Sequence, residues 1–136
     1  MITEKAKRNV AVYLKEVVKH ANVGNGGNSS NPAAESLDVP ILGNTDITTV
    51  NSESNEATID FKATFTGSQL QGNTIREFGL FGVFPQEGEE PDMVNVSGAA
   101  YNTDTEMFAR VNFEGIGPFS SSDQIEFILI MEVEWW

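Results

Sequence analysis

The chain has 136 residues, with 20 acidic residues against eight lysines and arginines, a formal net charge of −12, one histidine and no cysteine. A chain of this length forms one domain that buries about two-thirds of the surface of its unfolded state. The lack of cysteine excludes thiol catalysis, iron–sulfur clusters and disulfides, and it leaves His20 as the only nitrogen ligand for zinc, which excludes a zinc site. Neither a signal peptide nor a membrane-spanning apolar run is present, so we expect synthesis in the cytoplasm and no membrane insertion.

A basic N-terminal segment stands apart from an acidic remainder. Residues 1–20 hold five basic and two acidic side chains, a net of +3, which leaves −15 for the rest of the chain. An acidic surface repels phosphate, so nucleic-acid binding is not expected. The simplest interpretation is a solvated acidic face that keeps a β-rich protein in solution; adaptation to high salt, or a basic partner surface, is the alternative.

Four basic side chains of this segment are candidate interface residues, because complementary charged patches steer association and fix its register. We expect them to meet an acidic surface of the same subunit type or of an adjacent protein. They are Lys7, Arg8, Lys15 and Lys19.

A helix is predicted over 1–22, capped by Thr3 and ending near residue 20 or 21. Basic residues near its C-terminal end suit the helix dipole, so we interpret His20 as a helix-end residue and not as a catalytic base. The apolar stripe that faces the core consists of Ala6, Val10, Tyr13, Leu14, Val17, Val18 and Ala21.

Residues 23–45 are predicted to form a loop rich in glycine and asparagine, followed by an edge segment. The loop follows a helix and lacks the lysine of a phosphate-binding loop, so it does not match that motif. Pro40 indicates an edge position. The anchors of the edge segment are Leu37, Val39, Ile41 and Leu42.

Residues 46–136 are predicted to form an antiparallel β region, since the apolar period changes to two. Strand 57–66 is the clearest, and strand 74–84 is apolar on both faces, which makes it the central strand. Gly79 and Gly82 interrupt it, and we expect Gly79 to mark a bulge, a positive φ or the close approach of another group. The other predicted strands are 47–50, 93–101, 106–113 and 124–136.

Strand 124–136 is apolar on both faces up to the last residue. Ile128 and Ile130 lie opposite Phe127 and Leu129, so one helix and one sheet are too few to cover both sides. We therefore predict contact with other subunits through this strand, with Ile128, Ile130, Trp135 and Trp136 as interface candidates.

Together these elements predict a single domain over 1–136 of the α+β class, mainly β, in which one N-terminal helix packs on an antiparallel sheet or small sandwich. No enzyme is expected and no cofactor or metal is assigned, because the sequence holds no nucleophile elbow and no EF-hand loop. Residues 102–106 alternate oxygen ligands, but we interpret them as an ordinary polar turn and not as a calcium site.

Two segments carry a resemblance to a known group. The sequence reads IREFGLF at 75–81 and MFARVNF at 107–113, after a helix and a Gly-Asn-rich loop and before an apolar terminal strand. This order resembles the small tail-fibre and baseplate proteins of tailed bacterial and archaeal viruses, which share a segment of the form Ile-x-Glu-x-Gly-Leu-Phe. The loop at 114–118 and the long segment at 85–105 depart from the pattern.

The resemblance implies a virion structural protein that builds the tail tip or baseplate, or attaches tail fibres, and is synthesised in the host cytoplasm. Its implied partners are other tail or baseplate proteins and further copies of itself. The alternative is a carbohydrate-binding module of a tail fibre that uses Tyr101, Trp135 and Trp136.

The resemblance also implies a structural motif of Ile75, Glu77, Gly79, Leu80, Phe81 and Arg110. Glu77 is a charge in an apolar strand, so it must be paired or solvated. Arg110 is the expected partner, and exposure of Glu77 to solvent is the alternative.

Overall fold

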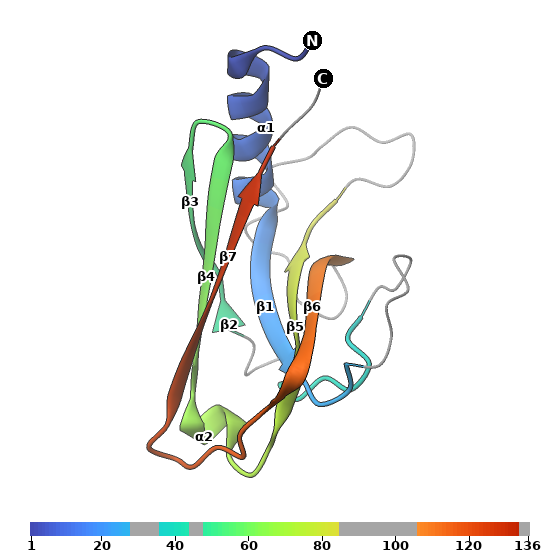
Figure 1. The fold of residues 1–136 in the computed structure, drawn as a ribbon, viewed down its shortest axis with the longest axis vertical. Helices are drawn as coiled ribbons and strands as arrows, with labels where there is room; N and C mark the ends of the chain where they lie inside the picture. Colours follow the sequence, from blue (N-terminus) through green and yellow to red (C-terminus); the bar gives the residue numbers. More distant parts are fainter. Residues whose placement is uncertain (28–35, 44–47, 85–105, 134–136) are drawn as a thin grey trace.

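The structure is a computed structural model that describes residues 1–27, 36–43, 48–84 and 106–133. It is of the α+β class and mainly β, as the sequence predicts (Figure 1). The helices are α1 (Glu4–Val17) and the short α2 (Gly67–Leu70). The strands are β1 (Val18–Gly24), β2 (Thr48–Thr49), β3 (Asn51–Asn55), β4 (Thr58–Thr66), β5 (Ile75–Gly82), β6 (Glu106–Ile116) and β7 (Gln124–Glu132).

The strands form two antiparallel sheets, so the sandwich form of the prediction is the one observed. One sheet has the order β2-β1-β5-β6 and the other has the order β3-β4-β7. The predicted strand 74–84 is β5, and it lies between β1 and β6 as a central strand should. The predicted strand 93–101 lies outside the described residues.

The N-terminal helix is shorter than predicted. α1 ends at Val17, and Val18 turns to an extended conformation while its N–H still donates to the carbonyl of Leu14. Figure 1 shows α1 running directly into β1 without a loop. The apolar spacing of Val18 and Ala21 fits a helix, but both residues are buried in the strand, where pairing with β5 outweighs local propensity.

This early helix end corrects three further expectations. Lys19 and His20 belong to β1, so the helix dipole does not explain them. Residues 22–24, predicted as part of the helix and the loop after it, complete the same strand. Pro40 does lie at an edge, because it forms an antiparallel bridge with Gly24.

β4 follows its predicted alternation. Ile59, Phe61, Ala63 and Phe65 are all buried, whereas Lys62 and Thr64 between them are exposed. The neighbouring strand β3 was not predicted, since its sequence NSESN has no apolar residue. A turn with Glu56 at φ 55° joins the two strands, and Thr58 Oγ1 donates to the carbonyl of Asn55 there.

Aromatic rings join the two sheets. Phe127 of β7 stacks on Phe78 of β5 with ring centroids 4.5 Å apart, and it meets Phe65 of β4 edge-on at 6.0 Å. Phe113 of β6 lies 5.8 Å from the same ring. Such pairs add to the burial of apolar area, so the apolar inner side of β7 belongs to the core of its own subunit.

β7 confirms the predicted two-sided terminal strand as far as Glu132. It pairs with β4 over nine consecutive positions without a register shift, and it is the outer strand of its sheet. Ile125, Phe127, Leu129 and Met131 are half-buried and pack against the core. Ile128 and Ile130 point the other way, with exposed fractions of 52% and 67%.

Candidate functional site

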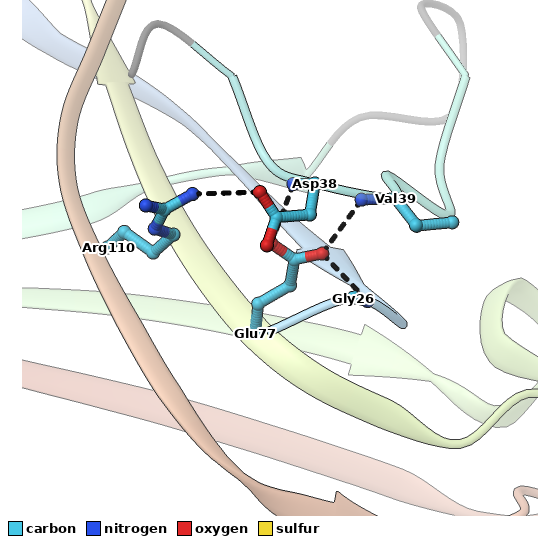
Figure 2. Close-up of polar contacts among 5 residues, drawn as sticks. All are labelled: Gly26, Asp38, Val39, Glu77 and Arg110. Atoms are coloured by element: carbon cyan, nitrogen blue, oxygen red, sulfur yellow. Dashed lines mark hydrogen bonds and ion pairs between the residues drawn. The ribbon is translucent and has the colours of Figure 1, made fainter. Parts of the chain in front are cut away.

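Glu77 is the most unusual side chain of the described residues, because its carboxyl group lies inside the protein. The residue is fully buried. Its Oε2 accepts hydrogen bonds from the backbone N–H groups of Gly26 and Val39, and its Oε1 accepts one from Asp38, each at 2.9 Å (Figure 2). The alternative that Glu77 faces solvent is therefore wrong, and the burial is compensated by three donors.

The space for this carboxyl group comes from two glycines. A Cβ at Gly24, which pairs with Glu77 across β1 and β5, would lie 2.3 Å from Glu77 Oε2. A Cβ at Gly26 would lie 2.7 Å from the same oxygen. The glycines of the predicted loop thus leave room for a side chain of β5, so the backbone can approach it closely.

Arg110 joins the same network through Asp38. Its Nη1 lies 3.4 Å from Asp38 Oδ1, and the arginine side chain is only 7% exposed. Asp38 therefore makes two contacts in the network: its backbone N–H donates a hydrogen bond to Glu77, and its carboxylate forms an ion pair with Arg110 (Figure 2). The expected pairing of Glu77 with Arg110 is corrected accordingly: the donors to Glu77 are backbone groups, and the ion pair of Arg110 is with Asp38.

Residues 36–42, which we call the strap, lie over this part of the sheet. Leu37 of the strap is buried above Gly79, where a Cβ would come within 2.9 Å of Leu37 Cδ2 and 3.1 Å of Phe81 Cε2. The expected close approach at Gly79 is confirmed in this form. A positive φ is not the reason, since the positive φ values among the described glycines are at Gly27, Gly72 and Gly117.

Asn22 is a second polar anchor of the strap, and sequence analysis missed it. It is fully buried, its Nδ2 donates to the carbonyl of Leu42, and its Oδ1 accepts from the N–H of Leu42, both at 3.2 Å. An asparagine in a stretch rich in Gly, Asn and Ser gives no distinguishing signal, and only its partner on the strap sets it apart.

The network has the features of a structural device. Among the described residues, every hydrogen bond that Glu77 accepts comes from a backbone N–H, and two of the three donors belong to the strap. A separate pocket of about 330 Å³ is lined by Ile41, Leu42, Ser68 and Gln69, none of them ionisable. Within the described ranges, no three acidic or histidine side chains cluster as metal ligands would.

The predicted basic interface residues separate into two groups. Arg8 and Lys15 lie on α1, where they form ion pairs with Glu56 at 3.7 Å and Glu16 at 3.9 Å. Lys7 also lies on α1 and is half-buried, as Lys15 is, and Lys19 lies on β1. The structure therefore does not bring all four together.

The remaining predicted residues divide by whether the structure describes them. Ile75 and Leu80 of the motif are buried in the core. Tyr101, Trp135, Trp136 and the polar segment 102–105 lie outside the described residues.

Comparisons with known proteins add no family. A scan of protein-family models and a search of the curated proteins both found no match to this chain. Of the two helices in the described part of the chain, neither has the length and apolar character needed to cross a membrane.

Glu77→Gln should destabilise the protein, because an amide has one acceptor oxygen and cannot replace a group that accepts on both oxygens. At least one buried N–H loses its acceptor, at about 1–3 kcal/mol for each such donor. Chemical denaturation measures the effect. Glu132→Gln, the same change at an exposed position of β7, is the matched control. Equal stability of the two variants would contradict the role given to Glu77.

Gly79→Val should cost about 1–3 kcal/mol, because the new side chain overpacks the space filled by Leu37 and Phe81. Thr64→Val, at an exposed position of β4, should be nearly silent. Adding Leu37→Ala should make the double variant less unstable than the sum of the single changes, since the cavity receives the valine. Thermal unfolding of the four variants tests this, and strict additivity would show that Leu37 does not limit the site.

Proposed function

We propose that this chain is a structural subunit of the tail of a tailed virus, where it builds the tail tip or baseplate or attaches tail fibres through protein–protein contacts. In this role it is not an enzyme, its partners are other tail proteins and further copies of itself, and its location is the virion. The two segments that carry the resemblance, 75–81 and 107–113, are neighbours in the fold, since β5 and β6 pair antiparallel. Their Glu77 and Arg110 both reach Asp38.

The observation that carries the proposal is that β7 is an outer strand with exposed apolar side chains. It is a nine-residue outer strand with a regular register, and it turns Ile128 and Ile130 to solvent. Proteins usually protect outer strands with proline, lysine, bulges or short length, because a free strand edge recruits other chains. β7 has none of these four devices and carries only the charges of Glu126 and Glu132 as protection, which suits a subunit that meets neighbours in an assembly.

A carbohydrate-binding module of a tail fibre is the alternative role. It would use the aromatic residues Tyr101, Trp135 and Trp136, which lie outside the described residues. Binding of the isolated chain to a glycan array, together with its loss in a Trp135→Ala/Trp136→Ala variant, would favour this alternative.

Particles of the virus whose genome carries this coding sequence test the proposal. Antibodies against the purified chain should label the tail in electron micrographs, and the chain should copurify with particles at a fixed stoichiometry. Ile128→Ser/Ile130→Ser should leave thermal stability close to that of the parent, since both side chains are exposed, yet reduce incorporation. Particles that lack the chain while infected cells contain it would refute the proposal.

A further inference from the structure

The outer face of the β3-β4-β7 sheet combines an apolar centre with acidic surroundings. Along β7, Glu126, Ile128, Ile130 and Glu132 all point outward, so the row reads acidic, apolar, apolar, acidic. Asp60 of β4 pairs directly with Ile130, and the exposed Lys62 pairs with Ile128 on the same side, so four carboxylates and one cation surround the two isoleucines. We call the set Glu53, Asp60, Lys62, Glu126, Ile128, Ile130 and Glu132 the acidic face.

Two carboxylates of the acidic face lie opposite one another. Glu53 of β3 and Asp60 of β4 are cross-strand partners in the antiparallel register. Like charges directly opposite on a sheet are destabilising. Lys62, two residues along β4 on the same side, balances one of the four carboxylates, which leaves the face at −3. A further cation brought by a partner would offset the remaining repulsion, so the face suits a basic surface.

The exposed side of α1 has the complementary pattern. At 100° per residue, Lys5, Arg8, Val12 and Lys15 fall within an arc of about 80° on the helix. Val12 is 42% exposed, and the Arg8 and Lys15 side chains are 50% and 31% exposed. We call these four residues the basic stripe, in which an apolar side chain lies between cations.

The dimensions of the two surfaces are compatible. Arg8 and Lys15 are seven residues apart on a helix, about 10 Å along its axis. Glu126 and Glu132 are six residues apart on a strand, about 20 Å. Arg8 and Lys15 flank Val12 and carry long, flexible side chains, whose reach covers the difference when Val12 is placed on Ile128 and Ile130.

One chain cannot make this contact with itself. Ala11 and Val17 of α1 belong to the core with Ile59 and Phe61, which places α1 on the inner side of the β3-β4-β7 sheet. Ser52, the partner of Phe61 across β3 and β4, donates to the carbonyl of Lys15 on that inner side. The acidic face is the opposite side of the same sheet, so the basic stripe of the same chain cannot reach it.

We infer that the basic stripe of one copy docks on the acidic face of the next, in a head-to-tail contact between copies of this chain. The inference rests on the proposed structural role and names the partner for it. The two surfaces differ, so the contact is heterologous, and it builds a ring where the rotation closes and a filament where it does not. The ion pairs of Arg8 and Lys15 within one chain are long, at 3.7 and 3.9 Å, and lie at the surface, so they contribute little and their exchange for contacts with the next copy costs little.

Two charge-reversal variants of the full chain test the contact by sedimentation velocity over a range of concentrations at low salt. Arg8→Glu/Lys15→Glu reverses the stripe, and Glu126→Lys/Glu132→Lys reverses the face. The parent should associate, and each variant alone should associate at least about tenfold more weakly. An equimolar mixture should recover association, because the reversed stripe meets the reversed face and the native stripe meets the native face.

Lys7→Glu/Lys19→Glu is the control, since it makes the same change in charge away from the stripe and should associate as the parent does. Val12→Ser, a neutral change at an exposed position, should weaken association without unfolding the chain, as a thermal scan would verify. A parent that stays monomeric at every concentration, or a stripe variant that associates as the parent does, would overturn the inference. If the particles contain the chain but the stripe variant associates as the parent does, the contact is overturned and the proposed structural role still stands.

Discussion

The carboxyl group of Glu77 joins three parts of the chain that lie far apart in the sequence. It belongs to β5, and it accepts hydrogen bonds from the N–H groups of Gly26, two residues after the end of β1, and of Asp38 and Val39 in the strap. A buried carboxyl group without donors would cost several kcal/mol, so the strap and the loop must lie where they do for β5 to hold this residue. The absence of side chains at Gly24 and Gly26 follows from the same requirement.

The motif IREFGLF has a physical explanation on this basis. Glu77 binds the backbone of the strap, Gly79 makes room for Leu37, and the ring of Phe81 packs beside that glycine. Ile75, Phe78 and Leu80 are buried in the main core between the sheets. β5 therefore packs against the aromatic core with one face and against the strap with the other. This explains why the strand is apolar on both faces, although it contains the charged residue Glu77.

Sequence alone predicted those parts whose signal is local. The alternation in β4 and the capped start of α1 are visible in the chain, and both were found. The end of α1 was missed because Val18 fits a helix equally well until β5 is there to pair with it. β3 is not predicted because its residues are polar, and they form a strand only because the turn brings them beside β4, with which they pair. The position of Glu77 in an apolar strand indicates a special role. Backbone donors have no signature in the sequence, however, so the predicted partner, Arg110, is not the group that binds Glu77.

Burial also divides the apolar residues of β7 by function. The half-buried residues Ile125, Phe127, Leu129 and Met131 pack against the core, where the ring of Phe127 meets those of Phe65, Phe78 and Phe113. Ile128 and Ile130 are exposed on the other side of the strand. Two exposed isoleucines in a strand of an acidic protein bring a risk of aggregation. The four carboxylates of the acidic face outnumber its one cation, Lys62, so they moderate the risk by repelling a copy that presents the same face, yet they leave the row open to a basic surface. Such a charge pattern disfavours face-to-face pairing and favours contact with a surface unlike itself, as the proposed head-to-tail contact requires.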